Sequence, residues 1–159
     1  MSKTDVPFAT THLVRDTCLC LHVQRAARAL ARRFDEALRP VGLTNEQFSL
    51  MMSLNRPLPA RMRDVAAHLA MDRSTLTAAI KRLNQRGLVD ILVDPGDKRA
   101  RFMVLTEPGR AVLASAVPLW EKSHRISEDL LDSARPDQLR RDLSALCTTS
   151  ASDTSDSSK

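Results

Sequence analysis

The chain has 159 residues, with 24 Lys and Arg against 19 Asp and Glu, a net charge of +5 and a pI near 9.6. This length suits one domain with a real core, and the basic balance suits a polyanionic partner. With no Tyr and one Trp, the sequence argues against platforms that stack RNA or single-stranded bases.

The N-terminal part combines an expected arm with a long helix. Residues 1–10 are predicted to form a flexible N-terminal arm. From about Leu13 to Leu38, apolar side chains recur at helical spacing and predict one long amphipathic helix. The stripe consists of Leu19, Val23, Ala26, Ala27, Leu30 and Phe34. So long a helix carries more apolar length than a small chain covers by itself, so we expect a partner subunit.

A capping box predicts the start of the next helix. The sequence TNEQ at 44–47 has the T-x-x-Q pattern, in which the first and last side chains satisfy each other's backbone N–H groups. Phe48, Met51 and Met52 then form an apolar face. Residues 55–60 contain two prolines and are predicted to form a loop.

Residues 61–87 are typical of a helix, a sharp turn and a second helix. Asp72 offers a side-chain cap to the second helix, and Gly87 suits the left-handed conformation in which helices often end. The apolar positions at helical spacing are Val65, Ala66 and Leu69 in the first helix and Leu76, Ile80 and Leu83 in the second.

After Gly87 the apolar period changes from helical to two, which predicts a β-hairpin turning at Pro95-Gly96. Its apolar positions are Val89, Ile91 and Val93 on the outgoing strand and Phe102 and Val104 on the return. The charged residues at the tip have no core to serve. Because the second helix fits a major groove and such a hairpin reaches flanking backbone or minor groove, this arrangement reads DNA.

The C-terminal part is predicted to be helical. Thr106 caps a helix with Pro108 in its first turn, and this helix continues to Leu131 with a kink at Pro118. Residues 133–136 break it. A last helix carries Leu139, Leu143 and Leu146, and residues 148–159 are expected to form a disordered tail.

Two stretches carry a family resemblance: LAMDRSTLTAAIKRLNQRGLV at 69–89 and DPGDKRARFMVLTEPGR at 94–110. They resemble the winged helix-turn-helix of the MarR family of bacterial transcriptional regulators, most specifically in D-K-R followed by L-T-x-x-G. The similarity covers roughly residues 11–146. It implies a mainly α fold with a small β-hairpin wing, residues 44–106 as the DNA-binding domain, and residues 11–43 and 107–147 as a helical dimerisation region.

The residues expected to contact double-stranded DNA lie on the outer face of the second helix and at the wing. They are Arg73, Ser74, Thr75, Thr77, Lys81, Asp97, Lys98, Arg99 and Arg101. Hydroxyls and an arginine at a helix N-terminus meet both phosphates and base edges. Many family members carry arginine where this chain has Ala78, so base readout here either shifts to Arg73 and the hydroxyls or is weaker.

Several of these positions have a plainer interpretation. Ser74 and Thr75 could merely help to cap the helix. Arg99 is expected to enter the minor groove with Asp97 holding its guanidinium, and the alternative is a solvated surface pair. Arg82 lies nearer the inner side of the helix, and we expect an intramolecular salt bridge for it.

Cys20 is the candidate for redox control. The segment around it is similar to the organic-hydroperoxide-sensing branch of the family, in which this position holds a reactive thiolate. The tyrosines that would hydrogen-bond the thiolate are replaced here by Gln24 and Phe34, and without donors a buried thiol is inert. Cys147 is a conceivable resolving partner. The alternative is that Cys20, on the buried stripe with Val23, only fills the core.

A small aromatic or lipophilic effector is the competing switch, since relatives of this family bind such ligands between the dimer helices and the DNA-binding domain. The candidate lining residues are Phe48, Met51, Met52 and Trp120, and the alternative is that this stripe is core.

These observations favour a cytoplasmic, homodimeric regulator that binds a pseudo-palindromic operator, acts as a repressor and is released by a small ligand. The alternatives are a thiol-based peroxide sensor and, from another class, a winged-helix module that binds proteins. We expect no enzyme, because the sequence has no G-x-S-x-G, H-E-x-x-H or glycine-rich phosphate loop. We also expect no metal, no cofactor and no membrane partner, since no histidine or cysteine spacing suits a metal and no apolar run approaches a membrane span of ~20 residues.

Overall fold

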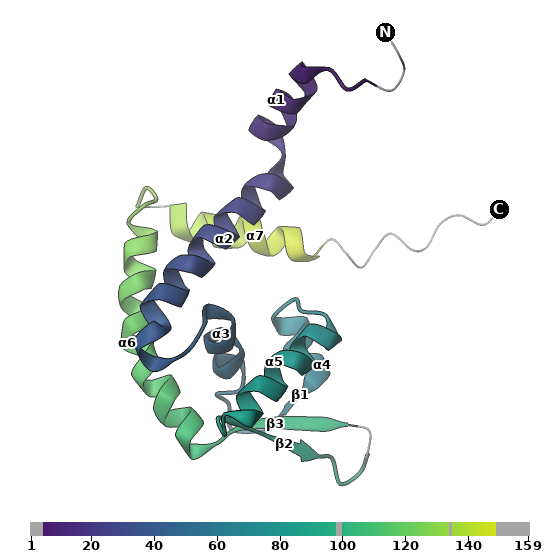
Figure 1. The fold of residues 1–159 in the computed structure, drawn as a ribbon, viewed down its shortest axis with the longest axis vertical. Coiled ribbons are helices and arrows are strands. Elements are labelled where there is room, and N and C mark those ends of the chain that lie inside the picture. Colours follow the sequence, from purple (N-terminus) through teal and green to yellow (C-terminus); the bar gives the residue numbers. More distant parts are fainter. Residues whose placement is uncertain (1–4, 98–99, 134, 149–159) are drawn as a thin grey trace, which may run out of the picture.

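The computed structural model describes residues 5–97, 100–133 and 135–148. Within them the chain is mainly helical, with one small antiparallel sheet (Figure 1). The elements are α1 (Phe8–Thr17), α2 (Leu19–Leu38), η1 (Arg39–Val41), α3 (Asn45–Ser53), β1 (Ala60–Arg61), α4 (Met62–His68), α5 (Arg73–Gln85), β2 (Val89–Val93), β3 (Arg101–Leu105), α6 (Glu107–Glu128) and α7 (Arg135–Thr148). Among the described helices, none has the length and apolar character that a bilayer span requires.

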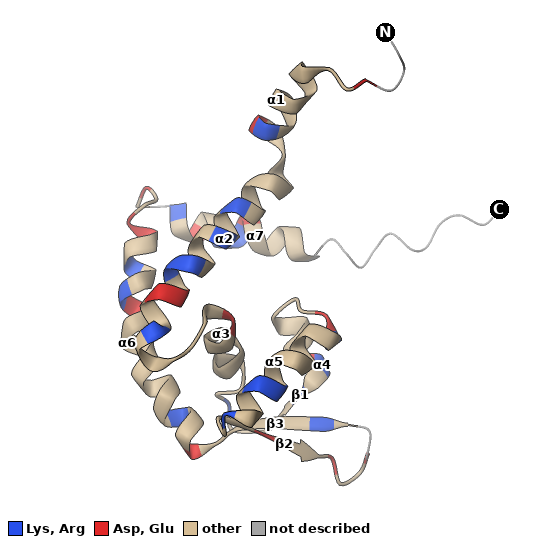
Figure 2. Ribbon diagram, viewed as in Figure 1, with Lys and Arg blue, Asp and Glu red and all other residues tan. Residues whose placement is uncertain are grey.

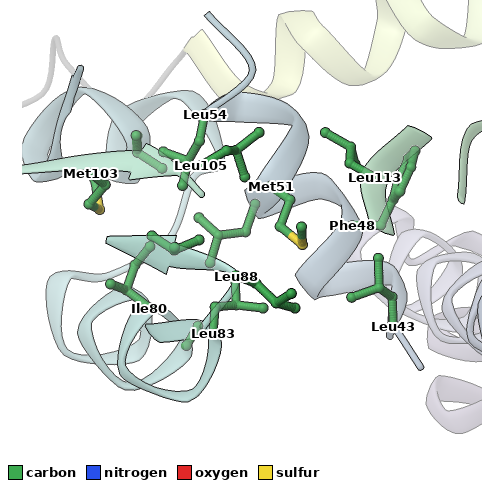
Figure 3. Packing of buried hydrophobic residues seen from close by; sticks show 14 of the residues in the cluster. Leu43, Phe48, Met51, Leu54, Ile80, Leu83, Leu88, Met103, Leu105 and Leu113 are labelled. Carbon is green, nitrogen blue, oxygen red and sulfur yellow. The ribbon is translucent and has the colours of Figure 1, made fainter. Parts of the chain in front are cut away.

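One hydrophobic core joins the helix-turn-helix, the sheet and the lower parts of α2 and α6. Leu76, Ile80 and Leu83 on the inner face of α5 are almost fully buried, as are Met51 of α3 and Met103 of β3 (Figure 3). α2 and α6 pack on each other and on α3, so the core continues from the sheet toward the long helices. The residues that build the helix-turn-helix are therefore held within a single chain.

The hairpin is confirmed, and a third strand extends its sheet. The strand order is β1-β3-β2, and all pairs are antiparallel. β1 was not predicted: Ala60 ends the predicted loop and Arg61 begins the predicted helix-turn-helix, and two residues carry no strand signal until β3 offers them an edge. Ala60 pairs with Met103, and Arg61 pairs with Phe102.

The buried face of the return strand is the one opposite the apolar positions Phe102 and Val104. Met103 and Leu105 are buried, whereas Phe102 and Val104 are half-buried. On β2 only Val89, which pairs with Leu105, is buried. Ile91, Leu92 and Val93, in the outer part of β2, are exposed, because β2 is an edge strand of the sheet.

The predicted long first helix is two helices. Cys18 is extended, with φ −71° and ψ 106°, and separates α1 from α2. α1 starts at Phe8, inside the predicted arm of residues 1–10. No proline or glycine marks the break. Of the ten residues of α1, all described, none is buried, so tertiary packing does not hold α1 in line with α2.

The C-terminal helices follow the prediction with shifted ends. α6 continues through Pro118 and ends at Glu128 rather than at Leu131, and α7 begins at Arg135, within the predicted break. The predicted disordered tail lies outside the described residues from position 149 on.

The start of α6 is fixed against the end of α5. Thr106 Oγ1 donates to the carbonyl of Gly87 at 2.7 Å and accepts from Gly109 N at 3.0 Å, while Thr106 N donates to the carbonyl of Leu88 at 3.2 Å. Gly109 is buried, and a Cβ there would lie 2.0 Å from the carbonyl oxygen of Leu88. Only glycine therefore allows this close approach.

We predict that Gly109→Ala lowers the free energy of unfolding by about 1–3 kcal/mol, since overpacking against backbone outweighs the better helix propensity of alanine. Urea denaturation of both proteins measures the difference. Gly96→Ala is the control, because its added Cβ would meet Asp94 Oδ1 at an ordinary 3.5 Å. Equal stability of Gly109→Ala and wild type would contradict the close approach.

Candidate nucleic-acid interface

Asp72 fixes the start of α5 by capping it. Its Oδ1 accepts from Thr75 N at 2.8 Å and from Ser74 Oγ at 2.5 Å, and its Oδ2 accepts from Thr75 Oγ1 at 2.5 Å. The hydroxyls of Ser74 and Thr75, followed by the Thr75 N–H, hold the pKa of Asp72 well below its usual range because they stabilise the carboxylate. The cap is therefore charged at neutral pH.

The predicted contact residues of α5 all lie on its exposed face. These are Arg73, Ser74, Thr75, Thr77 and Lys81. The protons of the Ser74 and Thr75 hydroxyls are donated to Asp72, and Thr77 Oγ1 donates to the carbonyl of Arg73 at 2.7 Å. The capping role of Ser74 and Thr75 is thus present, and their oxygens keep lone pairs that can accept a hydrogen bond from outside.

A groove of ≈ 760 Å³ lies between α4, α5 and the wing. Its lining residues are Arg61, Met62, Arg63, Ala66, Arg73, Thr77, Asp97, Ala100 and Arg101. Four of the nine are arginines and only Asp97 is acidic, so the groove is electropositive. Figure 2 shows basic residues on α5 and on β3.

Sequence reasoning missed Arg61 and Arg63, because both were placed at the start of the first helix of the helix-turn-helix and strand β1, which brings Arg61 against the wing, was not predicted. The Arg61 guanidinium lies 5.3 Å from the centre of the Phe102 ring, and its NH2 is 3.6 Å from Asp94 Oδ2. Arg63 pairs on the surface with Asp64, with Nε 3.3 Å from Oδ1. The signal available in the sequence was the two arginines at the start of the helix-turn-helix, Arg61 and Arg63.

The wing closes with a turn held by Asp94. Its Oδ1 accepts from Gly96 N at 2.8 Å, and Ala100 N donates to the carbonyl of Asp97 at 2.9 Å. Asp97 and Arg101 both line the groove. Lys98 and Arg99, the predicted tip residues, lie outside the described residues.

Arg82 does not form the predicted salt bridge. It is exposed and has no described acidic side chain within 4 Å, and it lines a second hollow of ≈ 420 Å³ between α2, α3 and α5. Asp35, the acidic residue of α2 in that hollow, instead accepts from the backbone N–H of Asn45 at 2.7 Å.

The environment of Cys20 differs from the prediction in two respects. Cys20 is exposed in the single chain rather than buried on the stripe, so it fills no core within one subunit. Gln24 Nε2 lies 3.1 Å from its Sγ and donates to it, so the replacement of tyrosine by Gln24 leaves a donor in place. Cys18 is half-buried and Cys147 is exposed, and all three described cysteines are free thiols.

The predicted ligand-pocket residues divide between core and surface. Phe48 and Met51 are buried in the core, Met52 is 41% exposed, and none of the four predicted residues lines either hollow. Trp120 is half-buried and stacks on Phe48 at 6.0 Å and on His124 at 4.7 Å between ring centres. Within the described residues, no cluster of His, Cys, Asp or Glu is arranged to hold a metal ion.

The fold is that of a winged helix-turn-helix protein, and comparisons with known proteins place it more narrowly. The MarR family profile matches residues 41–100. The DNA-bound structure of the M. tuberculosis transcriptional regulator MosR is 37% identical to this chain. The match covers 82% of this chain and 93% of the MosR chain, with a TM-score of 0.74. This chain belongs to the MarR family.

Two further relatives are informative. The transcriptional activatory protein BadR of Rhodopseudomonas palustris is 31% identical over 97 residues, 59% of this chain and 55% of BadR. The chain spans little more than half the length of the curated relatives that it first matches. Bordetella bronchiseptica BpsR, whose DNA binding is regulated by 6-hydroxynicotinic acid, is 25% identical, covers 83% of this chain and 94% of its own, and has a TM-score of 0.75.

The cap at Asp72 predicts an acid-dependent loss of stability. Because the pKa of Asp72 is lowered on folding, the unfolded chain binds a proton below about pH 4 that the native chain does not, so stability falls as pH falls. We expect the free energy of unfolding to fall less steeply between pH 5 and pH 2.5 in Asp72→Asn than in wild type. Urea denaturation at several pH values tests this, and parallel pH curves would show that the charged cap is not a stabilising group.

Proposed function

We propose that the chain is a homodimeric, sequence-specific regulator that binds double-stranded DNA through α5 and the wing. The observation that carries this is the groove between them, which four arginines line and a single carboxylate interrupts. Phosphates are the partners that such a surface attracts, and the backbone N–H groups at the capped start of α5 favour an anion as well.

The proposed contacts divide by position. Arg73 and Thr77 face the groove and are placed to meet base edges in the major groove, with the oxygens of Ser74 and Thr75 beside them. Lys81 lies further along the exposed face and suits a phosphate. At the wing we assign Lys98, Arg99 and Arg101 to the flanking minor groove and backbone, with Asp97 holding the guanidinium of Arg99. Arg61 and Arg63 extend the phosphate-binding surface from the other side of the groove.

The second subunit of the proposed dimer covers α1, α2 and α7. These helices leave large apolar side chains exposed, with Leu19 at 68% and Leu146 at 53%. Others on the same helices are Leu13, Leu30, Leu139 and Leu143. In Figure 1, α1 extends away from the winged helix-turn-helix, whereas α7 runs across the view above α3, α4 and α5. Contiguous apolar surface of this kind marks an interaction site, and a twofold pair of chains matches a pseudo-palindromic operator. The dimerisation region is residues 11–43 and 107–147.

Repression is the proposed sign of regulation. A small dimer on promoter DNA excludes polymerase sterically, and this requires no further surface. BadR is an activatory protein, so family membership leaves the sign to be measured.

A small aromatic or lipophilic ligand is the proposed inducer, by analogy with the regulation of BpsR by 6-hydroxynicotinic acid. Of the residues considered for it, half-buried Trp120 and exposed Met52 offer accessible apolar surface, whereas Phe48 and Met51 serve the core. The ligand acts by binding one separation of the two DNA-binding domains better than another.

The DNA interface is tested first with duplexes that wild type selects from a random pool. We predict that Arg73→Ala weakens binding roughly 5- to 150-fold, as expected for loss of a contact to a base edge. Arg56→Ala removes the same charge from an exposed loop position that lies outside both the groove and the dimerisation region, and it is the control. Fluorescence anisotropy at several salt concentrations provides the affinities. If the two variants bind alike, or wild type shows no salt-dependent binding, a protein-binding winged helix becomes the better explanation.

Peroxide sensing is the second candidate function, favoured by the exposed Cys20 and its Gln24 donor. It predicts that cumene hydroperoxide releases DNA from wild type but not from Cys20→Ser, because a serine cannot be oxidised to a sulfenic acid. The same anisotropy assay reports the release. Equal release from both proteins removes Cys20 from the mechanism.

A further inference from the structure

The connection between the long helix α2 and the C-terminal end of α5 runs through a few hydrogen bonds. Asp35 Oδ1 of α2 accepts from Asn45 N, the first residue of α3, at 2.7 Å. Gln47 Oε1, in the first turn of α3, accepts from Thr44 N at 3.1 Å and from Arg86 NH1 at 3.2 Å. Arg86 is the C-cap residue of α5. We call these three bonds the α2–α3–α5 chain.

Both terminal nitrogens of Arg86 are placed by the turn between α2 and α3. NH1 donates to Gln47, and NH2 lies where a Cβ on Gly42 would meet it at 3.4 Å. Gly42 has φ +68°, so the backbone of the turn is left-handed at this position. The guanidinium of Arg86 therefore lies across the turn and donates to Gln47, the last residue of the capping box.

We propose that Gln47 and Arg86 are positioning residues that set the orientation of α5 relative to α2, and hence the half-site spacing that the dimer accepts. This inference rests on the proposed homodimeric function. α2 belongs to the dimerisation region, whereas α5 carries the DNA contacts, and the chain of bonds links the two through α3.

The length of α5 explains why these exposed hydrogen bonds matter for the half-site spacing. α5 has 13 residues, so its DNA-facing start lies roughly 20 Å from Arg86. If α5 tilts by roughly 10° about its Arg86 end, Arg73 moves by roughly 3.5 Å, which is about one base-pair step. The buried residues Leu76, Ile80 and Leu83 hold α5 in the core independently of these bonds. Loss of the chain therefore changes orientation more than it changes folding.

The test measures how much the DNA affinity of each variant falls when the distance between the half-sites is changed. The duplex that wild type selects from a random pool is resynthesised with one or two base pairs inserted or removed at its centre. Arg86→Leu is the main variant, and Arg56→Leu is its control, since Arg56 carries the same charge, is exposed in the loop after α3 and lines neither hollow. Gln47→Leu breaks the chain from the other side, while Gln47→Glu keeps an oxygen that can accept from Thr44 and Arg86.

We expect Arg86→Leu and Gln47→Leu to reduce the affinity ratio between the best and the altered spacing by about fivefold or more, a typical coupling between sites. Arg56→Leu and Gln47→Glu keep the wild-type ratio, and combining Arg86→Leu with Gln47→Leu adds little to either alone. Thermal melting of each variant confirms that it is folded.

A spacing ratio in Arg86→Leu equal to that of wild type overturns the inference, and so does an equal reduction in Arg56→Leu, which would trace the effect to charge. If wild type binds DNA but ignores spacing, the proposed dimer fails and the inference fails with it. If Arg86→Leu does not fold, Gln47→Leu against Gln47→Glu decides the matter, because neither substitution changes the apolar face of α5.

Discussion

The structure depends on the burial of one face of α5 against the sheet. Leu76, Ile80 and Leu83 pack with Val89 and Met103 and leave almost no surface to solvent. Complete burial of a Leu or Ile contributes about 1.5–3 kcal/mol, more than any single surface bond in the molecule. Because the buried face is fixed, the opposite face of α5 must point outward beside the wing. The groove and its four arginines follow from this one packing constraint.

Features set by neighbours in the chain were predictable from the sequence. The caps at Thr44, Asp72 and Thr106 are all present with the expected backbone partners, and Gly87 has φ +70° as a helix end requires. Each depends on side chains within a few residues, so the sequence pattern contains the whole signal.

Features set by distant parts of the chain were not predictable. Strand β1 exists because β3 offers it an edge, and Met103 rather than Phe102 is buried because the sheet meets α5 on that side. Arg61 joins the groove only through that pairing. The break at Cys18 has no local breaker residue. Arg82 has no described acidic partner, and Asp35, which lines the same hollow, accepts from the backbone N–H of Asn45. The residues of α5 proposed to contact DNA were predictable, since they only had to oppose an apolar face.

The proposed mechanism joins two regions that differ in how much of their apolar surface is buried within one chain. The winged helix-turn-helix has its core within one chain, while α1, α2 and α7 leave apolar side chains exposed. Cys20 and its Gln24 donor lie on α2, in the region that a second subunit would cover. A signal there, whether an oxidant or a ligand, would act on the dimer and reach α5 through the turn between α2 and α3.

The most direct test of the central claim is a chemical footprint of the chain on a duplex that it selects. The account predicts protection of guanine N7 in two major-groove segments on one face, with centres about one helical turn, or ~10 base pairs, apart. Minor-groove protection should flank both segments, where the wings lie. A single protected segment, or protection with no preference for one face, would contradict a dimer that reads DNA through α5 and the wing.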